Sequence, residues 1–353
     1  MNPSTIASMT TTQHGEKVSH AASPRFDWIM AALATYFVGG LYLDGWAHAH
    51  GQVDESFFTP WHAVLYSGQL LMVAILSGVL VRNVWRGATL REALPRGYPL
   101  SLVGLLLWFI GGPGDLIWHT LFGIEKNVEA LYSPTHLLLA LGITLAVSGP
   151  LRAAYHRPAG ERRRLSEQLP MILSLTLVLS VLTFFMMIAH PLSNLWGTGW
   201  EESSNEAWGM TGIMLETALF MGVILLLVRQ WPPAPGALTV LVALNAIAMG
   251  FLFSGAYPLV FVVTRVLAGV AADGLLAWLK PSVQRPGAWR AFAALVPVVS
   301  YGLYFGAAQL TVGVIWTTHL WVGSLAIAGA IGVLVSLLVA PPAAAALPSS
   351  STT

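Results

Sequence analysis

Two stretches of the sequence, residues 37–62 and 109–136, carry the same arrangement of unusual residues. They read FVGGLYLDGWAHAHGQVDESFFTPWH and FIGGPGDLIWHTLFGIEKNVEALYSPTH. Each contains Phe-x-Gly-Gly, so that Phe37 aligns with Phe109, then Asp-x3-His, then Glu-x6-His across a Thr-Pro or Ser-Pro pair. A Gly, Gly68 or Gly142, follows six residues after the last His of each stretch. Agreement at so many spaced positions predicts a duplicated helical hairpin, whose parallel copies are related by an axis along the membrane normal.

The composition outside these stretches is that of a membrane protein. Of the 353 residues, 56% are apolar and only 9% are charged, whereas a soluble domain carries about 25% charged residues. A net charge of +1 gives no indication of nucleic-acid binding, and the absence of Cys excludes disulfides, thiolate catalysis and Cys-ligated metals.

The hydrophobic pattern predicts an all-α polytopic membrane bundle of about ten transmembrane helices. A helix needs about 20 apolar residues to cross the hydrocarbon core, and ten runs of that kind occur. The predicted spans are 27–47, 60–82, 99–122, 134–155, 169–190, 208–229, 236–254, 257–279, 289–310 and 313–340. We expect disordered tails at 1–25 and 341–353, the duplicated hairpins within 26–155, and a further bundle within 156–340.

Charged residues predict the orientation. Except for Lys126 and Arg265, the basic residues fall on the face that also holds both termini. Because Lys and Arg are enriched in cytoplasmic loops, this predicts a multi-pass plasma-membrane protein with both termini in the cytoplasm. Most acidic and His residues then map to the outer end of the bundle.

The spacing of these outer residues predicts a metal site. Asp and His at i and i+4 share one helix face. A Thr or Ser before Pro caps the next helix, and another His lies two residues after that Pro. Intramembrane ionisable groups are costly and are therefore functional candidates. The predicted metal ligands are Asp44, His48, His62, Asp115, His119, His136, His190 and His319.

Two glutamates accompany these ligands. Glu55 and Glu129 are predicted to move protons during catalysis, or instead to orient His62 and His136. Within the second half, Glu216 is a candidate proton carrier, and Arg265 and Asp273, two turns apart, are predicted to pair.

The Asp-x3-His pairs followed by a further His resemble the metal-binding helices of the C subunit of copper membrane monooxygenases. The resemblance covers about forty residues around Asp44, His48 and His62 and around Asp115, His119 and His136. It implies a membrane metal centre that oxidises a small apolar or lipid-soluble molecule with dioxygen. An electron-donor partner or a homo-oligomer would be consistent with it.

Other interpretations remain open at this stage. Asp, His and Glu without Cys suit copper or iron, and also zinc, so a zinc-dependent membrane hydrolase is an alternative to the oxidoreductase. An ion-coupled or metal-coupled transporter, or a metal-handling protein, is another, because parallel repeats and intramembrane carboxylates also occur in transporters. The paired Asp and His side chains could also form a structural network or a proton relay.

Overall fold

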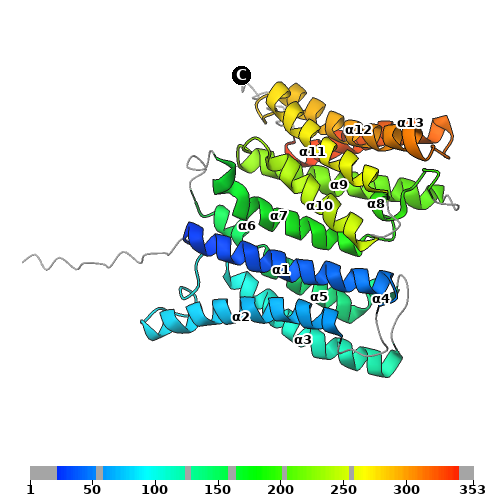
Figure 1. Cartoon of the computed structure of the whole chain (residues 1–353). Coiled ribbons are helices and arrows are strands. Elements are labelled where there is room, and N and C mark those ends of the chain that lie inside the picture. Colours follow the sequence, from blue (N-terminus) through cyan, green and yellow to red (C-terminus); the bar gives the residue numbers. More distant parts are fainter. Residues whose placement is uncertain are drawn as a thin grey trace, which may run out of the picture.

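Long apolar helices lying side by side make up the protein (Figure 1). The computed structural model describes residues 22–52, 59–123, 129–157, 164–200, 205–253 and 258–341. The helices of the first half are α1 (Pro24–Ala49), α2 (Pro60–Trp85), α3 (Pro99–Phe122), α4 (Glu129–Tyr132), α5 (Pro134–Val147), α6 (Gly149–Ala154) and α7 (Leu165–Phe185). Those of the second half are α8 (Pro191–Asn194), α9 (Glu206–Gln230), α10 (Ala237–Leu252), α11 (Leu259–Leu279), α12 (Pro286–Thr311) and α13 (Thr318–Val339).

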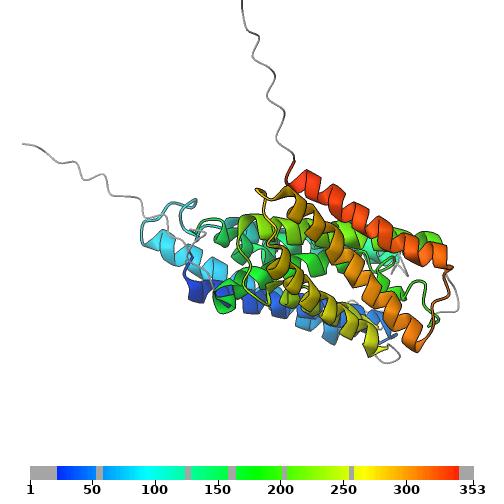
Figure 2. The same ribbon diagram turned by 90° about the horizontal axis from the view of Figure 1, so that it is seen from above.

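The prediction of a multi-pass helical membrane protein is confirmed. Among the described residues, nine helical segments are long and apolar enough to cross a bilayer, with α5 and α6 together forming one of them. Their outward surfaces carry large apolar side chains such as Leu70, Phe109 and Leu310, which suits contact with lipid. Helix α1 begins and α13 ends at the same end of the bundle (Figures 1 and 2).

The remaining predicted span, 236–254, is the seventh along the chain and forms the shorter helix α10. It has 16 residues, which at 1.5 Å per residue makes a rod of about 24 Å, less than the hydrocarbon core of about 30 Å. The helix cannot begin earlier, because Pro232, Pro233 and Pro235 lack an amide hydrogen and Gly236 has a φ of 89°. Helix α10 packs against α7 and α11.

The predicted hairpin duplication is visible in the packing. Helix α1 packs against α2, and α3 packs against α5. Helix α2 also contacts α3, and α5 also contacts α1, so exchanging the two hairpins exchanges these two contacts. That is the behaviour expected of two copies related by a two-fold axis.

The structure corrects the alignment of the two copies by one residue in their first helices. Gly40 and Gly111 pack against Leu65 and Leu139 of the following helix, so they occupy equivalent places. This alignment pairs Phe37 with Trp108 and leaves Phe109, which is 62% exposed, on the lipid side. Phe37 lies seven residues before Asp44 and Trp108 lies seven before Asp115, whereas Phe109 lies only six before it. The corrected alignment therefore runs without a gap into the Asp-x3-His pairs.

Equivalent side chains meet at the centre of the repeat. The rings of Phe37 and Trp108 are both buried, and their centroids lie 5.0 Å apart in an edge-to-face contact. Each ring's helix also approaches a glycine of its own partner helix, because a Cβ on Gly68 would lie 2.8 Å from Phe37 Cα and one on Gly142 would lie 3.0 Å from the Trp108 nitrogen. Small residues at these crossings allow the close backbone approach that is common between membrane helices.

Candidate metal centre

The helix caps hold the histidines of both hairpins in place. The Thr59 hydroxyl accepts a hydrogen bond from the His62 amide at 3.1 Å, and the Ser133 hydroxyl accepts one from the His136 amide at 3.2 Å. Pro60 and Pro134 occupy the first helical positions, where the missing amide hydrogen costs nothing. The predicted caps are confirmed, and each fixes a His in the first turn, near the end of the preceding hairpin helix.

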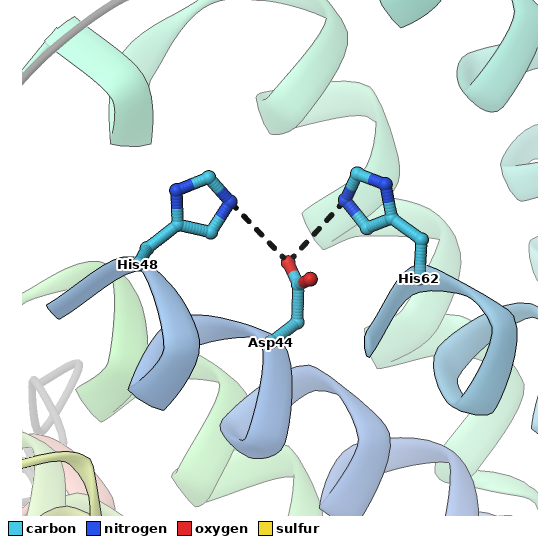
Figure 3. A group of neighbouring side chains, drawn as sticks. All are labelled: Asp44, His48 and His62. Carbon is cyan, nitrogen blue, oxygen red and sulfur yellow. Dashed lines mark ion pairs between the residues drawn. The ribbon is translucent and has the colours of Figure 1, made fainter. Parts of the chain in front are cut away.

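The first triad consists of Asp44, His48 and His62. Asp44 and His48 lie one turn apart near the end of α1, and His62 reaches the same carboxylate from α2. The Asp44 Oδ2 atom is 3.8 Å from His48 Nε2 and 3.4 Å from His62 Nε2, so the two rings flank the carboxylate (Figure 3). The other carboxylate oxygen, Oδ1, is buried and has no hydrogen-bond partner among the described residues.

The second triad consists of Asp115, His119 and His136, at the equivalent positions of α3 and α5. His119 Nε2 lies 3.2 Å from Asp115 Oδ2, and His136 Nε2 lies 3.4 Å from Asp115 Oδ1. The Nδ1 atom of His119 is 3.4 Å from the Gly123 carbonyl. An imidazole that donates from Nδ1 presents the lone pair of Nε2 to the carboxylate, and a cation between the two satisfies both.

These distances fit metal coordination. With bonds of about 2.0–2.1 Å, two ligand atoms of a tetrahedral metal stand about 3.3 Å apart, close to the four His-to-Asp separations of 3.2–3.8 Å. In each triad the ligand atoms of all three residues lie within 4.8 Å of one another. Three protein ligands leave a coordination position open, which is a feature of catalytic rather than purely structural metal sites.

The two triads differ in how firmly the carboxylate is held. The Thr135 hydroxyl donates a 2.7 Å hydrogen bond to Asp115 Oδ1, and Ser133 Oγ lies 3.1 Å from the Thr135 hydroxyl. The equivalent of Thr135 in the first hairpin is Trp61, whose indole instead donates to the Gln52 carbonyl. The second triad is therefore the better-organised of the two.

Exposure follows the same order for the Asp and for the His one turn after it, whereas the capped histidines are similar, at 22% for His62 and 25% for His136. The side chain of His48 is 51% exposed, against 17% for His119. The Asp44 side chain is 13% exposed, against 5% for Asp115. A ligand set that is already ordered and partly desolvated loses less freedom when it binds, so we expect the second triad to bind metal more tightly.

The two triads lie side by side. His48 is close enough to His119 and His136 to interact electrostatically with both, and Tyr66 does so with both Asp44 and Asp115. Tyr66 lies one turn after His62 on α2, and its hydroxyl would be 2.6 Å from a Cβ on Gly112 of α3. Its counterpart in the second hairpin is Ala140, so this phenol occurs once, between the copies.

Sequence reasoning missed Thr135 and Tyr66. The difference between Thr-Pro-Trp-His and Ser-Pro-Thr-His was visible as a departure from the repeat, and it marks Thr135 as a hydroxyl that only one triad has. Tyr66 carried no such signal, because its position between the hairpins depends on how α2 packs against α3.

The other predicted ligands lie elsewhere. His190 is fully buried ahead of α8, where its Nδ1 accepts the Leu192 amide and its Nε2 is 3.7 Å from Glu216. His319 is exposed in the first turn of α13, which packs against α9 and α12. Neither belongs to a triad. Glu55 lies outside the described residues, as does the side chain of Glu129, whose backbone begins α4.

The predicted pairing of Arg265 with Asp273 was wrong. Arg265 Nη2 instead donates to Glu216 Oε2 at 2.7 Å. Asp273 accepts hydrogen bonds from the Leu238 and Thr239 amides and from the Thr239 hydroxyl. An acid near the amino end of a neighbouring helix satisfies amide hydrogens that have no partner within that helix, and α10 gains a cap from α11 in this way.

Comparison of the chain with models of protein families, with curated proteins and with solved structures gives no match. The site therefore has to be interpreted from its own geometry.

Proposed function

We propose that this membrane protein holds one transition-metal ion in each Asp-His-His triad and acts as an oxidoreductase on a small apolar or lipid-soluble substrate. The observation that carries the proposal is the occurrence of two equivalent triads, each with three ligand atoms within 4.8 Å of one another. The two copies differ at neighbouring positions, such as Trp61 against Thr135 and Tyr66 against Ala140, yet both keep the Asp and the two His.

The types of ligand atom in the triads restrict which metal ions can bind. Two imidazole nitrogens and a carboxylate oxygen in each triad suit copper, iron or zinc, whereas Ca²⁺ and Mg²⁺ prefer oxygen ligands alone. The buried Asp44 Oδ1 and His136 Nδ1 atoms have no hydrogen-bond partner in the part of the chain that the structure describes. Such atoms are costly unless a bound species or water satisfies them.

The ligand pattern favours redox chemistry at this position. The ligand pattern resembles that of the C subunit of copper membrane monooxygenases, and copper or iron bound there would supply the redox chemistry that such an enzyme needs. The chain's own part is to hold the metal, to keep a coordination position open and to orient Asp115 through Thr135. The surrounding apolar helices give a lipid-soluble substrate a route from the bilayer.

Metal content of purified variants tests the proposal. We expect two metal ions per wild-type chain, one in Asp44→Asn, one in Asp115→Asn and none in the double variant. His319→Ala is the matched control, because His319 is exposed and belongs to neither triad, and it should retain both ions. Wild-type protein that binds no transition metal, or a double variant that binds as much as the wild type, would refute metal binding.

Spectroscopy and transport assays then separate the kinds of function. Copper or iron with an electron paramagnetic resonance signal that changes when an apolar substrate and dioxygen are added supports the oxidoreductase. If the protein binds zinc alone, the oxidoreductase proposal is refuted in favour of a hydrolase. Metal uptake into proteoliposomes that depends on Asp44 and Asp115 would refute it in favour of a transporter.

A further inference from the structure

An arginine without a counter-ion lies at the end of the bundle opposite the triads, near the start of α3. Arg152 of α6 donates to the carbonyls of Gly97 and Leu145, at 2.8 and 3.0 Å. Its guanidinium also donates to the hydroxyls of Ser101 and Ser148. All four acceptors are neutral, and the described residues provide no carboxylate partner for this side chain.

The neighbouring arginine, in contrast, is neutralised within the protein. Arg157 Nη2 lies 2.6 Å from Asp27 Oδ2, and the Tyr98 hydroxyl donates to the same carboxylate at 2.7 Å. Asp27 is therefore already matched to one positive charge, and the charge of Arg152 is left over. A positive charge that is partly removed from water is stabilised by a nearby negative charge, so this place suits an external anion.

An open cavity lies beside Arg152. It has a volume of about 270 Å³ and is lined by Gly97, Pro99, Leu100, Arg152, Tyr155 and His156. One water molecule needs only about 10–15 Å³ of such space, so the cavity has room for a larger group. The side chains of Tyr155 and His156 are exposed and make no hydrogen bond to other described residues. A phenol hydroxyl and an imidazole N–H are donors, and here an incoming molecule can reach them.

The position of the cavity along the bundle favours a membrane lipid as the incoming molecule. Tyr155 directly follows the apolar span 134–154 and packs edge-on against Trp231, with ring centroids 4.6 Å apart. Trp85, at the same end of the bundle, is 85% exposed. Trp and Tyr are enriched at the headgroup level of a bilayer, and Leu100, which is 49% exposed, begins the apolar surface next to the cavity.

The surrounding charges favour an anionic lipid. The segment between residues 82 and 97 contains four exposed arginines and a single acid, Glu92; the arginines are Arg82, Arg86, Arg91 and Arg96. Clusters of basic residues at the membrane surface attract anionic lipids, and basic pockets between membrane helices bind their headgroups.

We propose that the cavity beside Arg152 binds the phosphate headgroup of an anionic membrane phospholipid. Arg152 supplies the balancing charge, Tyr155 and His156 donate hydrogen bonds to the phosphate oxygens, and Leu100 contacts the start of the acyl chains. The site shares no residue with the metal triads and lies at the other end of the bundle, so it does not depend on the proposed function.

Native mass spectrometry of the full-length protein in an uncharged detergent tests this site. Delipidated protein is titrated with dioleoylphosphatidylglycerol, which is anionic, and with zwitterionic dioleoylphosphatidylcholine, and the affinity for the first bound lipid is measured. We expect the wild type to bind the anionic lipid more tightly. Arg152→Gln should weaken that binding about fivefold, the effect typical of one basic residue near a membrane surface. Arg91→Gln is the matched control, because Arg91 is exposed at the same end but does not line the cavity, and it should bind like the wild type.

A second pair of variants guards against a folding defect in Arg152→Gln. His156→Ala removes an exposed donor at the cavity and should weaken binding of the anionic lipid severalfold, the loss expected for one hydrogen bond. His319→Ala makes the same substitution at the opposite end of the bundle and should leave the affinity unchanged. Equal affinity of the wild type for the two lipids would overturn the proposal. Losses in Arg152→Gln and His156→Ala that are no larger than those in Arg91→Gln and His319→Ala would also overturn it.

Competition distinguishes a lipid headgroup from a soluble phosphate, which offers the same anionic oxygens. Millimolar inorganic phosphate should leave the phospholipid bound, because it lacks the hydrocarbon that contacts Leu100. Complete displacement of the lipid by inorganic phosphate would assign the cavity to a soluble phosphate compound and overturn the lipid as its ligand.

Discussion

Removing one hydroxyl should weaken one metal site and leave its twin unchanged. Thr135→Val keeps the shape of the side chain but removes the 2.7 Å hydrogen bond to Asp115 Oδ1. Outer hydrogen bonds to metal-binding carboxylates and imidazoles typically change affinity by 10–100-fold, which corresponds to about 1.4–2.8 kcal/mol. A hydrogen bond to a charged group contributes about 1.5–3 kcal/mol, so the two magnitudes agree.

The measurement isolates the second triad by working in an Asp44→Asn background. Zn²⁺ is titrated against a competing chelator, with and without Thr135→Val. Thr144→Val on the same helix is the control, because the Thr144 hydroxyl donates to the Ala140 carbonyl and does not touch either triad. If Thr135→Val changes the Zn²⁺ affinity by no more than Thr144→Val does, Thr135 does not organise the site and the argument for the tighter second triad is wrong.

Three further outcomes follow from the packing. Trp61→Thr places a hydroxyl where the first hairpin lacks one, and should raise the Zn²⁺ affinity of the Asp44 triad by up to about tenfold, measured in an Asp115→Asn background; an unchanged affinity would show that the threonine acts only in its own hairpin. Gly40→Ala should lower the free energy of unfolding by about 1–3 kcal/mol, because the added Cβ would lie 2.7 Å from Leu65 Cα, whereas Gly39→Ala meets nothing within 4 Å; denaturant unfolding in detergent compares the two, and equal stability would contradict the close crossing. Glu216→Ala should cost about 3–5 kcal/mol by leaving Arg265 buried and unpaired, and Glu216→Ala combined with Arg265→Leu should recover part of that loss in the same assay; no recovery would mean that the pair is not coupled.

The fold class and the triads could be predicted because their signals are local. Apolar runs of about 20 residues mark membrane helices whatever they pack against. Predicting the first triad required only two local features. The helix periodicity places Asp44 beside His48, and the helix cap fixes the position of His62. The second copy repeats both signals, so the sequence could predict each triad from residues close together in the chain.

The parts that failed depend on long-range packing. Arg265 was matched with Asp273 on its own helix because sequence spacing shows only intrahelical neighbours, while its actual partner, Glu216, is on α9. The Phe-x-Gly-Gly alignment matched Phe37 with Phe109 because the residue types are identical. In the structure, the buried residue that is equivalent to Phe37 is Trp108. His190 was predicted to join the triads because it also lies near the outer end of a predicted span. A shared position along the membrane normal does not show which helices lie between two side chains.

The contact of Phe37 with Trp108 also bears on how such a protein can evolve. When equivalent positions of two copies touch, the arrangement is that of a symmetric dimer, in which every substitution appears in both halves. Covalent fusion removes that restriction. Thr135 at the position equivalent to Trp61, and Tyr66 at the position equivalent to Ala140, are differences that two identical subunits could not hold, and they let the two candidate sites differ in how firmly each carboxylate is held.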